Sequence, residues 1–117
     1  MHWKELEVWK ITHQLVLEIY RVTANFPKSE TYGLVDQLKR AAYSVPANIV
    51  EGQSRHTTKE YLLFLYNARG SLEEVRYFLL LSHDLGFLDE NIYQALEKRY
   101  ESASKMLNGL IKSLKPR

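Results

Sequence analysis

The sequence predicts an all-α protein, an up-down-up-down antiparallel four-helix bundle formed as a single domain over residues 1–117. Three observations lead to this prediction. Apolar residues recur at three- and four-residue steps along four long stretches, with no convincing strand alternation. The chain holds only three prolines and five glycines, which leaves room for long helices. The breaks between the stretches are short, and short connections favour antiparallel neighbours.

The first predicted helix, from about Lys4 to Asn25, carries more apolar surface than one bundle seam needs. Its apolar residues form two adjacent stripes at helical spacing, Leu6, Trp9, His13, Val16 and Tyr20 in one and Val8, Ile11, Leu15, Ile19 and Val22 in the other. Phe26-Pro27 is expected to end the helix, because the residue before a proline is disfavoured in the α region.

The second predicted helix begins near Ser29, a candidate N-cap that places Glu30 in the first turn, where a carboxylate suits the helix dipole. Its apolar stripe comprises Leu34, Leu38, Ala41, Ala42, Val45 and Ile49. Pro46 lies in its interior, where it removes one backbone hydrogen bond and is expected to kink the helix. Gly52 marks the expected exit.

Polar residues run along the opposite side of the second predicted helix. We call the polar stripe the six that recur at three- or four-residue steps, Gln37, Arg40, Ser44, Asn48, Glu51 and Arg55. A solvated surface is the ordinary interpretation, but the stripe lacks Lys, and Asn48 beside Pro46 is a poor helix former. Such side chains satisfy one another when partly covered, as at a subunit interface. Glu73 and Glu74 are candidate partners for Arg40 or Arg55.

The third predicted helix opens with a capping box, Thr57-Thr58-Lys59-Glu60, and continues to Leu85, with Gly86 at the position of a left-handed C-cap. Its expected core stripe comprises Phe64, Leu65, Ala68, Leu72, Val75, Leu79 and Leu85. Other apolar residues surround much of its circumference, which predicts a central helix or one covered by another chain. The small residues Gly70-Ser71 indicate close approach of a neighbouring helix.

The fourth predicted helix begins after Asp89, another candidate N-cap, and ends before Pro116. Its apolar stripe comprises Ile92, Leu96, Tyr100, Ala103, Leu107, Leu110 or Ile111, and Leu114.

The net charge of +2 hides an uneven distribution. Residues 60–97 carry two basic and seven acidic side chains, whereas residues 98–117 carry six basic and one acidic. This asymmetry predicts pairing between the two segments.

The basic residues also admit an RNA-binding surface, with the aromatic side chains of Tyr43 and His56 nearby. Its candidate contacts are Lys39, Arg40, Arg55, Lys59, Lys112, Lys115 and Arg117. For a single chain, the favoured interpretation is that these basic side chains balance the acidic segment, since the pI of 8.8 lies below the value of about 9 typical of basic domains. A symmetric oligomer would present several copies of the basic surface.

Several function classes lose support from the composition. The absence of Cys excludes disulfides, thiolate metal sites and a cysteine nucleophile. No histidine follows a glutamate at the Glu-x-x-His spacing of di-metal sites, so we expect no metal. The glycines are scattered and form no phosphate-binding loop, so we expect no cofactor and no enzymatic activity. An enzyme that uses Glu51, Glu73 or Glu74 as a base is a minor alternative.

No apolar run approaches the roughly 20 residues of a membrane span, and no secretory leader is evident, which favours a cytoplasmic protein without a membrane partner.

Two motifs carry a family resemblance. The second predicted helix contains Gln37-Leu38-x-Arg40-Ala41-Ala42-x-Ser44-Val45-Pro46-x-Asn48-Ile49-x-Glu51-Gly52-x-x-Arg55, and the third contains Gly70-Ser71-x-Glu73-Glu74. With these motifs the chain resembles the bacterial four-helix-bundle proteins encoded in 23S ribosomal RNA intervening sequences, over nearly its whole length. Mild departures are Lys39, where Arg is expected, and Val50, where Ala is common.

The resemblance implies a four-helix bundle that assembles as a homopentamer. It also implies similarity to accessory proteins of diversity-generating retroelements, which pair with a reverse transcriptase and nucleic acid. The family pattern marks Arg40, Asn48, Glu51 and Arg55 without assigning them a role. The leading hypothesis is therefore a non-enzymatic homo-oligomer, associated with structured RNA or a nucleic-acid enzyme. The alternative is a structural module that binds another polypeptide through its apolar helix faces.

Overall fold

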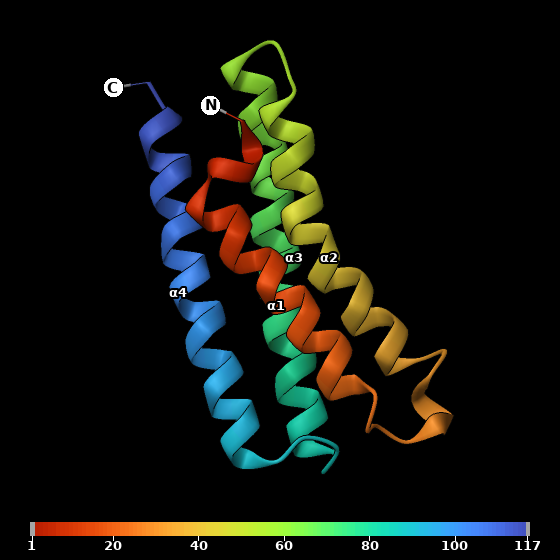
Figure 1. The fold of residues 1–117 in the computed structure, drawn as a ribbon. Helices are drawn as coiled ribbons and strands as arrows, with labels where there is room; N and C mark the ends of the chain where they lie inside the picture. Colours follow the sequence, from red (N-terminus) through yellow and green to blue (C-terminus); the bar gives the residue numbers. More distant parts are fainter. Residues whose placement is uncertain (1, 117) are drawn as a thin grey trace.

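Four long helices run alternately down and up the molecule in the computed structural model, which describes residues 2–116 (Figure 1). They are α1 (Glu7–Thr23), α2 (Leu34–Gln53), α3 (Thr58–Asp84) and α4 (Glu90–Leu114). The short 3₁₀ turns η1 (Trp3–Glu5) and η2 (Lys28–Glu30) precede α1 and α2. The predicted all-α, antiparallel four-helix bundle is confirmed.

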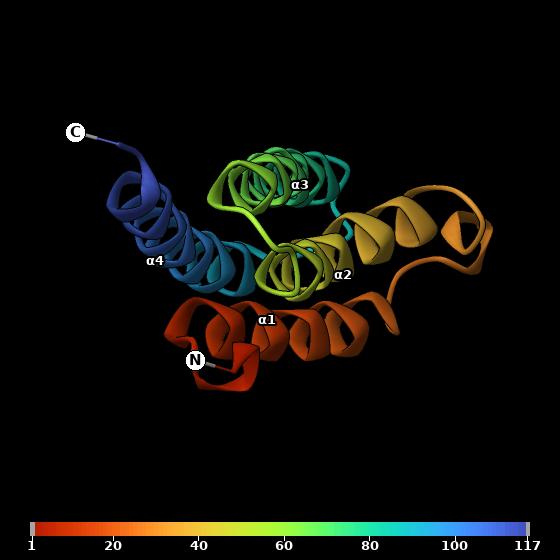
Figure 2. The ribbon, with the colours of Figure 1, turned by 90° about the horizontal axis from the view of Figure 1, so that it is seen from above.

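The helices pack in a ring order, with each one beside its neighbours in sequence and α1 also beside α4. Seen end-on, α2 lies between α1 and α3, so that α1 and α3 occupy opposite sides of the molecule (Figure 2). The bundle is elongated, with extents of 46 × 24 × 20 Å. The end that holds both termini and the α2–α3 turn we call the terminal end (Figure 1).

The core is built from one apolar face of each helix, as the spacing predicts. Its most deeply buried large side chains include Leu15 and Ile19 of α1, Leu38 and Ile49 of α2, Leu65, Leu72 and Leu79 of α3, and Tyr100 and Leu107 of α4. Removing this apolar surface from water is the main stabilising contribution to a bundle of this size. The expected core position of Leu85 is wrong: Leu85 is 53% exposed, because α3 ends at Asp84 and Leu85 is its C-cap. Ile92, expected in the apolar stripe of the fourth helix, is also exposed, at 40%.

Side-chain caps define the starts of α3 and α4 as predicted. The backbone amide of Glu60 donates to Thr57 Oγ1 at 3.1 Å, and the amide of Ile92 donates to Asp89 Oδ1 at 2.9 Å. Gly86 follows α3 with φ of +83°, the left-handed conformation that glycine adopts at low cost.

The predicted N-cap at Ser29 is wrong. After Pro27 the chain forms a 3₁₀ turn, in which the amides of Glu30 and Thr31 donate to the carbonyls of Pro27 and Lys28. These i→i+3 bonds use the backbone groups that an α-helix would need. α2 therefore begins only at Leu34, which is buried, and continues without a break through the buried Pro46.

Several large apolar residues are exposed on α1 and α3, the two helices for which the sequence predicts extra apolar surface. Leu17 and Tyr20 on α1 are 46% and 45% exposed, and Leu63, Tyr77 and Leu80 on α3 are 57%, 58% and 42% exposed. No helix within residues 2–116 is long and apolar enough to cross a membrane.

Candidate functional site

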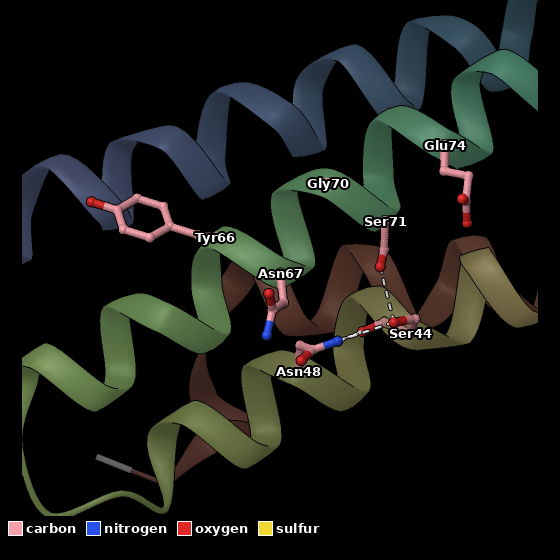
Figure 3. Close-up of a pocket in the computed structure, with 7 residues that line it drawn as sticks. All are labelled: Ser44, Asn48, Tyr66, Asn67, Gly70, Ser71 and Glu74. Carbon is pink, nitrogen blue, oxygen red and sulfur yellow. Dashed lines mark hydrogen bonds between the residues drawn. The ribbon is translucent and has the colours of Figure 1, made fainter.

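A polar groove lies between α2 and α3, near the middle of each helix (Figure 3). It has a volume of about 470 Å³, and its lining residues are Ser44, Asn48, Tyr66, Asn67, Gly70, Ser71 and Glu74. At its centre Ser71 Oγ donates to Ser44 Oγ at 2.9 Å, while Asn48 Nδ2 donates to the same oxygen at 3.0 Å and to the Ser44 carbonyl at 2.8 Å. This network joins the two helices through side chains that are small and half-buried.

Two glycines explain the shape of the α2–α3 contact. A Cβ on Gly52 would lie 2.9 Å from Phe64 Cβ and 2.9 Å from Tyr61 Cδ1, so Gly52 permits the close approach of the helices. A Cβ on Gly70 would meet no described atom within 4 Å. The interpretation of Gly70-Ser71 as a point of close approach is therefore wrong for Gly70, which instead leaves one side of the polar groove open to solvent.

The structure brings only part of the polar stripe together with α3. Ser44 and Asn48 are half-buried in the groove, which Glu74 also lines. Gln37, Arg40, Glu51 and Arg55 are exposed, although the Arg55 guanidinium lies 4.6 Å from the centre of the Phe64 ring of α3. Sequence reasoning missed Asn67 and Tyr66 as groove residues. Asn67 and Tyr66 precede Ser71 by four and five residues on α3. This spacing puts the three side chains on neighbouring surfaces of the helix and could have identified them.

The predicted partners of the arginines are wrong. Arg40 Nε pairs with Asp36 Oδ2 at 2.9 Å, and Arg55 Nη2 pairs with Glu51 Oε2 at 3.0 Å, both at i,i+4 spacing on α2. Glu73 pairs with Arg76 on its own helix. These carboxylates lie within reach along the same helix surface, so an interhelical contact is not needed. The hydrogen bond that Arg40 Nε donates to Asp36 also raises the pKa of the Arg40 guanidinium.

The candidate nucleic-acid contacts divide between two places. Lys39 lies on α2 with its ammonium 4.5 Å from the centre of the Tyr20 ring, beside Arg40. Arg55, Lys59, Lys112 and Lys115 lie toward the terminal end, where α2 ends, α3 begins and α4 ends (Figure 1). Arg117 lies outside the described residues.

A second cleft opens at the terminal end, between the first turns of α3 and the end of α4. We call it the basic cleft; its volume is about 610 Å³, and it is lined by Thr58, Lys59, Leu62, Leu63, Tyr66, Leu114 and Pro116. Two cations approach the Tyr66 ring, Arg69 at 5.0 Å and Lys115 at 5.7 Å from its centre. Sequence reasoning missed Tyr66 and Arg69, although Leu62, Tyr66 and Arg69 follow i, i+4, i+7 spacing on one helix face.

Within residues 2–116, no ion pair joins the acidic segment to the basic segment, contrary to the prediction. Two pairs join α3 to α4 among the described residues, Arg76 Nη2 with Glu97 Oε1 at 2.6 Å and His83 Nε2 with Glu90 Oε2, and all four residues belong to the acidic segment. The antiparallel topology explains this result, because the basic end of α4 lies beside the start of α3, whereas Glu73, Glu74 and Asp84 lie farther along α3. Within residues 2–116, Lys59, Lys112 and Lys115 have no carboxylate partner.

Metal-binding chemistry finds no support in the part of the chain that the structure describes. There, no three His, Asp or Glu side chains lie close enough together to hold a metal ion. Of the three glutamates considered as a base, Glu51 and Glu73 are in ion pairs and Glu74 lines the polar groove.

Comparisons with known proteins agree with this architecture. The family model of the 23S rRNA-intervening sequence protein matches residues 4–109. A solved structure of a protein with unknown function from the S23 ribosomal protein family of Bacteroides thetaiotaomicron VPI-5482 is similar, with a TM-score of 0.81. The two chains are 20% identical over 90% of this chain and 98% of the other, which establishes the shared fold. The search of curated proteins gives no match.

Proposed function

This chain belongs to the 23S rRNA-intervening sequence protein family, and from that premise we propose that it is a non-enzymatic accessory protein that self-associates into a ring, as a pentamer, and binds nucleic acid. The proposal includes a cytoplasmic location, where such a protein would meet structured RNA or a nucleic-acid enzyme.

The observation that carries nucleic-acid binding is the group of cations at the terminal end. Lys59, Lys112 and Lys115 are exposed and have no carboxylate partner among residues 2–116. Cations that are not neutralised within the protein release counterions when they contact phosphates, and this release favours binding of nucleic acid. Contacts between α3 and α4 do not neutralise the basic charge at the end of α4, and this supports a basic surface there.

Self-association is supported by the two exposed apolar surfaces. One lies on α1, with Leu17 and Tyr20, and the other lies on α3, with Tyr77 and Leu80. Because α1 and α3 are on opposite sides of the bundle (Figure 2), contact between the α1 surface of one copy and the α3 surface of the next would be heterologous. Heterologous contacts that close produce cyclic rings.

A ring would strengthen weak nucleic-acid binding. Each subunit contributes the same small basic surface, and several identical surfaces on one particle engage a long RNA together. Avidity of this kind does not require a large basic patch on any single chain, which agrees with the modest net charge of +2.

The test is the binding of a labelled RNA hairpin by the purified protein over a range of salt concentrations. We expect binding at low ionic strength that weakens steeply as salt rises. The double variant Lys112→Gln/Lys115→Gln should bind several-fold more weakly and with a shallower salt dependence. The matched control Lys28→Gln/Lys98→Gln changes the charge equally, outside the C-terminal turns of α4, and should bind as the wild type does. Absence of salt-dependent binding would contradict the nucleic-acid part of the proposal.

The alternative function is binding of another polypeptide through the same apolar surfaces. The exposure of Tyr77 at 58% and Leu80 at 42% favours it specifically, because large exposed apolar side chains mark sites of protein contact. A stoichiometric polypeptide that copurifies with the protein, with little nucleic acid present, would support this alternative over RNA binding.

A further inference from the structure

The basic cleft is not a simple cationic surface, and its shape suggests what it binds. Resting on the proposed function, we propose that it holds a single-stranded segment of nucleic acid, with an unpaired base against Tyr66 and the neighbouring phosphates on Lys59, Arg69 and Lys115.

The walls of the cleft are apolar. Leu62, Leu63 and Tyr66 of α3 face Leu114 and Pro116 at the end of α4. Its volume of about 610 Å³ falls within the range of about 300–1,000 Å³ that is usual for small-ligand sites. Leu63 is 57% exposed, so apolar surface at this position is available to an incoming group. Phosphate contact alone would not use such walls, whereas the flat face of a base would.

Tyr66 brings the apolar and cationic parts of the cleft together. Its ring lies 5.0 Å from the Arg69 guanidinium and 5.7 Å from the Lys115 ammonium. Arg69 Nη1 also donates to Asn108 Oδ1 of α4 at 3.2 Å, which fixes the guanidinium across the α3–α4 seam. Figure 3 shows Tyr66 pointing away from the serine pair of the polar groove and towards α4. An aromatic ring with flanking cations is the arrangement by which proteins hold stacked bases and their phosphates.

This arrangement favours a single strand over a duplex. In a duplex the base faces are stacked on one another and the outer surface presents phosphates and sugars. A duplex would therefore contact Lys59 and Lys115 but leave Leu63 and the Tyr66 ring unmatched. In a loop or an unpaired end the bases are free to turn outward and stack on an aromatic side chain.

The test compares a labelled RNA strand of about 12 nucleotides, within the site sizes of single-strand binders, with the same strand annealed to its complement. Tyr66→Leu removes the aromatic face, Tyr66→Phe retains it, and Tyr32→Leu is the matched control at a tyrosine that is 95% exposed and precedes α2. We expect Tyr66→Leu to lose about tenfold or more in single-strand affinity, as removal of one stacking contact does. Duplex affinity should change by less than about twofold, because it depends on phosphate contacts. Tyr66→Phe and Tyr32→Leu should bind as the wild type does.

Arg69→Gln provides a second variant that leaves the cleft walls in place, and it should weaken single-strand binding several-fold. Salt-dependent binding that is equal for single strand and duplex, or that does not respond to Tyr66→Leu, would overturn this inference and leave the proposed function standing. Binding to neither form would overturn both. A copurifying polypeptide that Tyr66→Leu releases would identify the cleft as a protein-docking site and would also overturn the inference.

Discussion

Two glycines on neighbouring helices show how much one Cβ position matters. Gly52 lies where α2 meets α3, and a Cβ there would overlap Phe64 and Tyr61 at 2.9 Å. Gly70 lies on α3, where an added Cβ would meet no described neighbour within 4 Å. In sequence both are glycines in helical stretches, and only the packing distinguishes them.

We expect Gly52→Ala to lower the free energy of unfolding by about 1–3 kcal/mol, the usual cost of overpacking. Gly70→Ala should leave it unchanged or raise it by up to about 1 kcal/mol, because alanine is the better helix former. Urea unfolding of both variants followed by circular dichroism measures the difference. Equal effects of the two substitutions would show that the α2–α3 contact is looser than described.

Tyr100 gives the bundle a sensitivity to high pH. Its side chain is 1% exposed in the core, and burial raises the pKa of its hydroxyl. Above about pH 10 the unfolded chain releases the tyrosine proton while the folded chain retains it, so the folded state loses stability as pH rises.

Tyr100→Phe should therefore reduce the loss of stability between neutral pH and about pH 11. Thermal melts of the variant and the wild type at a series of alkaline pH values provide the measurement. Tyr32→Phe, at a residue that is 95% exposed, is the matched control and should leave the pH dependence unchanged. An identical pH dependence for Tyr100→Phe and the wild type would contradict the burial of this hydroxyl.

Helix starts show what local sequence predicts at the scale of an element. Thr57 and Asp89 are side-chain caps, and their residue types and spacing identify α3 and α4 in advance. α2 starts after a 3₁₀ turn, whose backbone hydrogen bonds leave no signature in the side chains, so its start was misplaced at Ser29.

The contribution of a cap is directly measurable. Thr57→Ala should lower the free energy of unfolding by about 0.5–2 kcal/mol, because the amide of Glu60 loses its acceptor. Thr58→Ala, in the next residue and also exposed, should change it by less than about 0.5 kcal/mol. If both variants lose the same stability, Thr57 does not cap α3.

Contacts between helices were less predictable than the helices themselves. Charge counts along the sequence predicted pairing between residues 60–97 and 98–117, but the antiparallel topology places most of the acidic residues far from the basic end of α4. Likewise, Arg40 and Arg55 found partners on α2, at a spacing that the sequence already contains. The polar groove and the basic cleft each combine residues of two helices, and a single helical stripe predicts only half of such a site.

For the whole molecule, the exposed surfaces of α1 and α3 predict how a ring is held together. Leu17→Glu should disrupt the contact through α1, and Leu80→Glu should disrupt it through α3, so each variant alone should fail to form the ring. When the two variants are mixed, the intact α3 surface of one matches the intact α1 surface of the other. The mixture should therefore form heterodimers, as native mass spectrometry would show. Formation of full rings by either variant alone would place the contact elsewhere.

The central claim is that this bundle works as a ring that carries nucleic acid. It is tested most directly by mass-resolved light scattering of the wild-type protein with simultaneous absorbance at 260 and 280 nm. The account predicts a particle of five chains, each of 13.8 kDa, with excess absorbance at 260 nm that is lost in high salt. A particle with the mass of one chain and the absorbance ratio of pure protein would contradict it.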